Sequence, residues 1–172
     1  MAKTTFSGPV YSKNGFINTG PGNTISLTAD TTLTVATHAG RLLLTNDADG
    51  KFTLPTINVN SNSAVAGDTD YNNLNNIGAS FYFYVETAAT DMDILTDGTD
   101  MFVGAILVAV DDGAKKAFFP GGSDDTITMN GGTKGGIAGS ILSITAIDDD
   151  AYLVHSSLLK GSSTIATPFA TS

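Results

Sequence analysis

The stretch Phe81-Tyr82-Phe83-Tyr84-Val85 is the strongest indication of fold in this sequence. Successive side chains of a β-strand point to opposite faces, so Phe81, Phe83 and Val85 would share one face and the two tyrosines the other. Large side chains on both faces predict a central strand that protein covers on both sides. We therefore expect a fold built around a β-sheet.

The two-residue period of this stretch recurs on either side of it. Ile25 and Leu27 alternate with threonine and serine, and Leu33 and Val35 alternate with threonine. Glycine and aspartate interrupt the pattern at short intervals, as is typical of all-β proteins. With no amphipathic helix in the pattern, about ten short strands are expected. The remaining candidates are residues 41–45, 51–54, 91–95, 102–110, 114–119, 126–129, 140–147 and 152–159.

Four dipeptides predict the turns between these strands: Asp49-Gly50, Asp97-Gly98, Asp112-Gly113 and Asn130-Gly131. Each contains residues that tolerate positive φ angles, so each is expected to connect two antiparallel strands as a hairpin. Many short strands without helices must still protect their sheet edges. The expected fold is all-β, an antiparallel β-sandwich or partly closed barrel.

Three segments depart from the strand pattern and divide the chain. Residues 1–22 are rich in glycine and aromatic residues and are expected to form an extended N-terminal arm, and residues 162–172 a C-terminal tail. Residues 23–161 would form the β domain. Within it, residues 58–79 are rich in asparagine and predict a long loop, which is usually functional or mobile.

The composition excludes several classes of function. Seventeen acidic residues against eight basic ones give a net charge of −9, and Arg41 is the only arginine, so nucleic-acid binding is not expected. Residues 1–9 lack the apolar core of a secretory signal, and the apolar run 101–110 is too short to span a membrane. With no cysteine in the chain, synthesis in a reducing cytoplasm is expected.

The sequence offers little material for catalysis. Only His38 and His155 could act as general bases near neutral pH, and a structural role is the simpler interpretation of both. Glu86 is the only glutamate, and no Gly-x-Ser-x-Gly nucleophile motif is present. The prediction is that the protein is not an enzyme, with a secreted or surface enzyme on a β scaffold as the least favoured alternative.

No cofactor or metal is predicted. Aligning Gly50 with the central glycine of an EF-hand places Thr45 and Thr56 where carboxylate ligands are required, so that motif is excluded. The glycine-rich segment 131–136 lacks the order of residues that binds phosphate in a P-loop. A calcium site built from aspartate-rich loops stays open as an alternative to ordinary solvated turn aspartates.

Short motifs in a particular order extend over nearly the whole chain. They are Thr5 to Val10 with Ser12, Asn14, Gly15 and Phe16; Ala36 to Leu44; Phe52 to Pro55; Phe81 to Val85; Asp100 to Gly104; Asp125 to Gly132 with Gly135 and Gly136; and Ala166 to Phe169. In this order they resemble small virion structural proteins of tailed phages, notably phages of marine and cyanobacterial hosts. The long segment 58–79 departs from the pattern.

The resemblance implies a capsid decoration, or cement, protein. Such a protein would bind the major capsid protein on the outside of the virion, often as a homotrimer, and would bridge neighbouring capsomers without catalytic residues. Apolar residues in the terminal segments are the candidate contacts with the capsid or with other subunits, although packing on their own domain is an equal alternative. They are Phe6, Pro9, Val10, Tyr11, Phe16, Ile17, Pro168 and Phe169.

A tail fibre, spike or adhesion module that contacts host glycan is the alternative function. A β-sandwich is compatible with either role, because fold alone does not determine function. The two differ in the number of copies per particle, which is far higher for a decoration protein.

Overall fold

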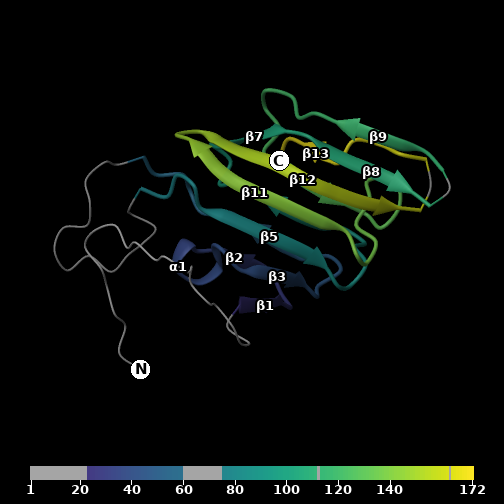
Figure 1. Ribbon diagram of the computed structural model, residues 1–172, viewed down its shortest axis with the longest axis horizontal. Helices are drawn as coiled ribbons and strands as arrows, with labels where there is room; N and C mark the ends of the chain where they lie inside the picture. Colours follow the sequence, from purple (N-terminus) through teal and green to yellow (C-terminus); the bar gives the residue numbers. More distant parts are fainter. Residues whose placement is uncertain (1–22, 60–74, 112, 163) are drawn as a thin grey trace, which may run out of the picture.

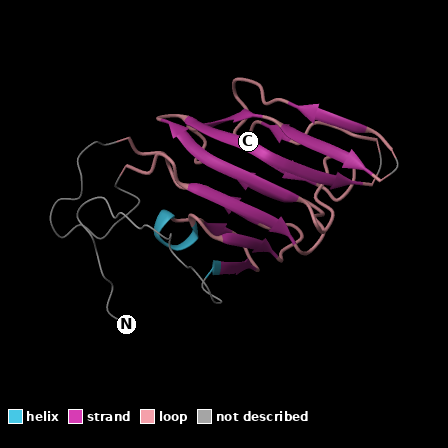
Figure 2. Cartoon of the chain, in the orientation of Figure 1, coloured by secondary structure: helices cyan, strands magenta, loops and turns pink. Residues whose placement is uncertain are grey.

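The computed structural model describes residues 23–59, 75–111, 113–162 and 164–172. The predicted N-terminal arm, with Phe6, Pro9, Val10, Tyr11, Phe16 and Ile17, lies outside the described residues. Almost all of the regular secondary structure of the described chain lies in two β-sheets (Figure 2), which confirms the all-β prediction.

The larger sheet has eight strands, and seven of them follow one another in the order β1-β3-β5-β11-β12-β8-β9. In Figure 1 they run from β1 at the bottom to β9 at the top, with β11 in the middle. β7 pairs with β12 off this path. The strands are β1 Thr24–Leu27, β3 Leu42–Thr45, β5 Ser80–Val85, β7 Met101–Gly104, β8 Ile106–Val110, β9 Lys115–Phe118, β11 Ile141–Asp148 and β12 Ala151–Gly161.

The smaller sheet has five strands in the order β13-β10-β6-β4-β2. They are β2 Thr31–Thr32, β4 Lys51–Thr53, β6 Met92–Leu95, β10 Thr126–Met129 and β13 Phe169–Ala170. Its inward side chains lie in one line across four strands, because Phe52 pairs with Ile94, Ile94 with Ile127, and Ile127 with Phe169.

The two sheets are mixed, and the prediction of antiparallel pairing throughout is wrong. From β1 to β7 successive strands alternate between the sheets, so strands that are neighbours within a sheet run in the same direction. Thus β1, β3 and β5 are parallel, as are β2, β4 and β6. Two antiparallel hairpins, β8–β9 and β11–β12, complete the larger sheet.

This alternation corrects the interpretation of three of the four predicted turns. Asp49-Gly50, Asp97-Gly98 and Asn130-Gly131 each lie between a strand of one sheet and a strand of the other. Only the turn between β8 and β9 closes a hairpin as predicted. Glycine permits a sharp change of direction whichever sheet the next strand joins. The dipeptides therefore predicted the positions of the turns but not the sheet to which the next strand belongs.

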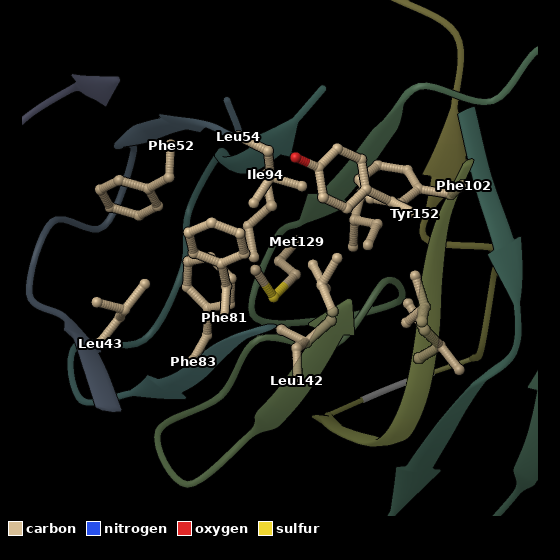
Figure 3. Packing of buried hydrophobic residues seen from close by; sticks show 14 of the residues in the cluster. Leu43, Phe52, Leu54, Phe81, Phe83, Ile94, Phe102, Met129, Leu142 and Tyr152 are labelled. Atoms are coloured by element: carbon tan, nitrogen blue, oxygen red, sulfur yellow. The ribbon is translucent and has the colours of Figure 1, made fainter. Parts of the chain in front are cut away.

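A continuous apolar core lies between the sheets (Figure 3). Phe81 and Phe83 of β5 point inward together with Leu43 and Leu142 of the flanking strands, and all are buried. Phe102 and Phe169, from opposite sheets, pack with their ring centroids 6.5 Å apart. Alternation along each strand therefore supplies one inward face per sheet, and burial of that face is the main stabilising contribution.

Two local expectations need correction. Residues 31–36, predicted as one strand, form β2 and then enter a short helix, α1 Val35–His38, which the pattern did not predict. Residues 102–110 divide into β7 and β8 at Gly104, where φ is +102° and an added Cβ would lie 2.2 Å from the carbonyl oxygen of Val154. Only glycine allows the backbone to approach β12 so closely.

The C-terminal tail is part of the domain. β13 pairs with β10, and Asp125 holds Ser172 by accepting hydrogen bonds from its backbone N–H and its hydroxyl, both at 2.7 Å. Residues 164–172 therefore complete the smaller sheet and are not an extended arm. The sequence pattern missed β13 because only two of its residues pair.

Candidate binding surfaces

His38 is a structural residue at the end of α1. Its ring is buried, and Nδ1 accepts a hydrogen bond from the backbone N–H of Thr34 at 2.9 Å. Burial lowers the pKa of His38, the nearby Arg41 charge lowers it further, and a backbone hydrogen bond with Thr34 opposes both. A neutral imidazole that accepts a hydrogen bond from the residue preceding its own helix fits the structural role expected for His38.

His155 belongs to a chain of hydroxyl groups on the outer face of the larger sheet. Its Nε2 lies 3.1 Å from Oγ1 of Thr145, which lies 2.8 Å from Oγ of Ser80. Among the described residues, the hydrogen-bond partner of the His155 ring is a hydroxyl and not a carboxylate. The network links β5, β11 and β12 by side-chain hydrogen bonds.

Two aspartates of the β6–β7 connection have opposite pKa shifts. Burial raises the pKa of Asp100, and the charges of Asp97 and Asp150 add to the effect, although the N–H of Ile57 donates to Oδ2 at 2.9 Å. Burial opposes ionisation of Asp97 as well, but hydrogen bonds from Thr56, Thr99 and the N–H of Asp100 outweigh it and lower the pKa to about 2. Asp97 thus stabilises its own turn by hydrogen bonds, and Asp100 links this connection to the backbone at Ile57.

The described residues contain no group of three or more histidine, cysteine, aspartate or glutamate side chains placed to hold a metal ion. Two of the aspartates that suggested a loop-built calcium site accept hydrogen bonds from their own turns, Asp97 from Thr99 and Asp124 from Gly121. These two carboxylates fit the interpretation as turn aspartates.

An apolar row crosses the outer face of the larger sheet. Its members pair directly from strand to strand, so that their side chains stand next to one another on one face. The apolar row consists of Leu44, Tyr84, Ile141, Leu158 and Leu107, in the order in which their strands lie in the sheet. The last four side chains are 38%, 44%, 37% and 41% exposed, respectively.

The sequence pattern anticipated this face only in part. Apolar and aromatic residues on both sides of β5 predicted that protein covers both sides of the strand, but Tyr82 and Tyr84 are exposed in this chain. The strands of the larger sheet contain one carboxylate, Asp148 at the end of β11, which pairs with the outward Ala151, in a chain with seventeen acidic residues. The other outward residues of this face are mostly uncharged, with histidine and lysine among them. A face of this kind is typical of a contact surface.

The outer face of the smaller sheet is different in character. It forms a shallow concavity of about 380 Å³ in which hydroxyl and charged groups predominate. Side chains of this kind suit hydrogen bonding to a polar ligand or to water. The lining residues are Lys51, Asp91, Asp93, Leu95, Thr126, Thr128, Ala170, Thr171 and Ser172.

A second exposed apolar feature lies beside β7. Phe119 is 73% exposed and follows β9 directly, at the border of a groove of about 350 Å³. The groove is lined by Met101 to Gly104 on one side and by Phe119 to Gly122 on the other, with Asp150 and Ala151. A protruding aromatic ring next to a groove is a common anchor in protein interfaces.

The predicted contact residues of the C-terminal segment are buried in this chain. Pro168 is buried, and Phe169 is 5% exposed within the core of this chain. Packing on their own domain, the alternative considered for them, describes both residues. The exposed apolar surfaces instead involve Phe119 and the apolar row. Each member of the row lies in a different strand, so the row does not appear as a continuous apolar run in the sequence.

No family of known proteins matches this chain, and no curated protein or solved structure is significantly similar to it. Among the described residues, no helix has the length and hydropathy needed to cross a membrane.

Proposed function

We propose that this chain is a virion structural protein that decorates the outside of a tailed-phage capsid. The ordered motifs of the sequence support the class of protein. The observation that carries the mode of action is the exposed ring of Phe119 beside its groove, on a domain with a closed core. The protein acts by binding alone, and stabilises the shell because it binds only the assembled form.

Phe119 is the anchor in this proposal. It enters a pocket of the major capsid protein, while the groove beside it receives an apolar side chain from the shell. Interfaces depend on a few such buried aromatic residues, so removal of one has a large effect on affinity. The terminal residues Phe6 and Phe16 stay predicted anchors, because they lie outside the described residues.

Cosedimentation with expanded capsids that lack the protein tests the proposal. Phe119→Asp is expected to reduce binding at least tenfold, since a charge at a hot spot must be desolvated. Ile77→Asp is the matched control, because Ile77 is 40% exposed and outside the groove. Wild-type binding by Phe119→Asp would overturn the role of Phe119.

The number of copies per purified particle tests the class itself. A decoration protein occupies repeated sites over the whole shell, so hundreds of copies are expected by quantitative mass spectrometry. A count typical of a fibre or spike would reject decoration. The homotrimer implied by the resemblance stays a prediction for the protein bound to the capsid.

Glycan adhesion is the second candidate, and the concavity of the smaller sheet favours it. Lys51, Asp93 and Thr128 offer donors and acceptors of the kind that bind sugar hydroxyls. A glycan array that shows specific binding, abolished by Asp93→Ala, would support adhesion over decoration. An array without signal is expected if the chain only decorates a capsid.

A further inference from the structure

We infer that the outer face of the larger sheet binds the same face of a second copy of this chain, about a two-fold axis that runs along β11. β11 is the fourth of the seven strands in the order β1-β3-β5-β11-β12-β8-β9 (Figure 1). A two-fold axis along the middle strand, in the plane of the contact, places β5 over β12 of the second copy and β3 over β8. Symmetric, self-complementary contacts of this kind are the usual basis of dimers.

The apolar row is nearly symmetric about that axis. Ile141 lies on the axis and meets Ile141 of the second copy. Tyr84, one strand away on one side, meets Leu158, which lies one strand away on the other side. Leu44 meets Leu107 in the same way at the next pair of strands. Each exposed apolar side chain of the row therefore receives an apolar partner.

The charged residues at the end of the face also become complementary. Glu86 follows Tyr84 by two residues, and Lys160 follows Leu158 by two residues. β5 and β12 are both antiparallel to β11, so these two residues lie at the same end of the sheet. The two-fold axis places Glu86 over Lys160 of the second copy, and the pair occurs twice. Opposite charges across a contact fix its register.

The charge of the whole chain favours a second copy as the occupant of this particular face. Two chains of net charge −9 repel each other, so a contact between them is least costly where carboxylates are few or meet basic residues. Along the stretch from Ser80 to Glu86, the carboxylate of the larger sheet is Glu86, which meets Lys160 of the second copy, and Asp148 lies beyond this stretch at the end of β11. The outer face of the smaller sheet carries Asp91 and Asp93. An acidic protein that associates with itself would use the larger sheet.

The size of the face is sufficient for a stable dimer. Seven strands about 4.8 Å apart span about 29 Å, and the outward residues from Ser80 to Glu86 extend about 20 Å along a strand. The projected area is about 600 Å², and interdigitating side chains bury more than the projection, close to the roughly 800 Å² per partner of stable complexes. Two sheets that pack face to face with aligned strands are a standard arrangement.

Mass measurement on the isolated protein is the first test. Light scattering coupled to size exclusion is expected to give twice the 17.6 kDa of the chain at micromolar concentration. Ile141→Asp places two carboxylates against each other on the axis and is expected to give a monomer with an unchanged circular dichroism spectrum. Ile77→Asp, a control of similar exposure outside the sheet, is expected to stay dimeric.

Charge reversal tests the geometry. Glu86→Lys and Lys160→Glu are each expected to weaken the dimer at least tenfold, because each places like charges together twice. The double variant restores opposite charges and is expected to recover dimerisation. Both residues are at least partly exposed, so the single variants are expected to fold. Loss without recovery would overturn the two-fold arrangement.

Cross-linking identifies the residue on the axis. The chain has no cysteine, so Ile141→Cys introduces a single thiol that a short bismaleimide is expected to join to its equivalent in the second copy. Ile77→Cys is expected to stay uncross-linked. A monomeric wild-type chain, a trimer, or equal cross-linking of both variants would overturn the inference. The inference does not depend on capsid binding, which is measured separately with Phe119→Asp.

Discussion

Thr45 is an unusual residue in the core of the larger sheet. It points inward from β3, is fully buried, and its hydroxyl has no hydrogen-bond partner among the described residues. Threonine fits the β-strand because it is branched at Cβ, but a buried hydroxyl without a partner costs free energy. The residue is compatible with the fold without being optimal for it.

We expect Thr45→Val to stabilise the protein by about 1 kcal/mol, since valine keeps the shape and removes the unpaired hydroxyl. Chemical denaturation with urea measures the free energy of unfolding. Thr53→Val, at a half-buried position of β4, is the control and is expected to have a smaller effect. A loss of stability in Thr45→Val would indicate that the hydroxyl has a partner.

Tyr152 shows the opposite situation, a buried hydroxyl with a partner. Its ring is fully buried, and its hydroxyl donates a hydrogen bond to the carbonyl oxygen of Pro55, also buried. Burial, with the charges of Asp100 and Asp97, raises the pKa of Tyr152, so the hydroxyl keeps its proton. Tyr152 therefore fastens the segment after β4 to β12.

Tyr152→Phe is expected to lower the free energy of unfolding by about 1–3 kcal/mol, because the Pro55 carbonyl would stay buried without a donor. Tyr82→Phe, at an exposed position of β5, is the matched control and should have little effect. Equal stability of the two variants in urea denaturation would contradict the importance of this bond.

At the scale of elements, the long connection between β4 and β5 is closed at its base by Asn76. This buried amide accepts a hydrogen bond from the N–H of Asn58 at 2.8 Å and donates one to the carbonyl of Thr56 at 2.9 Å. The backbone N–H of Asn76 also donates to the carbonyl of Asn58. The ends of the predicted 58–79 loop are thus held side by side.

Asn76→Ala is expected to cost about 1–3 kcal/mol, because the hydrogen bonds of the Asn76 side chain to the N–H of Asn58 and the carbonyl of Thr56 would both be lost. Proteolysis is the more specific measurement, since opening of the base should speed cleavage between residues 58 and 79. Ile77→Ala, at an exposed position next to it, is the control. Unchanged cleavage of Asn76→Ala would show that the base is held by other contacts.

At the scale of the whole molecule, the carboxylates determine how stability depends on pH. Burial opposes ionisation of Asp125, but hydrogen bonds from Ser172 and Thr126 lower its pKa below the usual range, as hydrogen bonds do for Asp97. Stabilisation by a lowered pKa is present above the ordinary carboxylate value and is lost as the pH falls through the folded value. Asp100, whose pKa is raised by burial, has the opposite dependence.

We therefore expect stability to fall in acid, in part between about pH 4 and pH 2, where Asp97 becomes protonated. Asp97→Asn should lower the melting temperature by several degrees at neutral pH and have a smaller effect as the pH approaches 2. Asp100→Asn should gain stability relative to the native chain as the pH rises. Melting temperatures recorded by circular dichroism across this range test both signs. Parallel pH profiles of the native chain and Asp97→Asn would contradict this assignment.

Much of the fold is visible in the sequence because strand periodicity is a local property. The alternation around Phe81 and Phe83, the turn dipeptides, and most strand positions depend only on neighbouring residues, and the structure confirms that the chain is all-β. The candidate surfaces were less predictable. Phe169, expected at an interface, is in the core, whereas Phe119 and Ile141 are exposed and were not singled out.

Local patterning is sufficient to predict short strands with an apolar inner face and sharp glycine turns. Packing in three dimensions determines that the strands from β1 to β7 alternate between two sheets, which makes neighbours within each sheet parallel, and that the apolar row is exposed on an outer face. The difference arises because alternation within a strand depends on residues two apart. Sheet membership and exposure depend on packing between segments far apart in the chain, which no local pattern encodes.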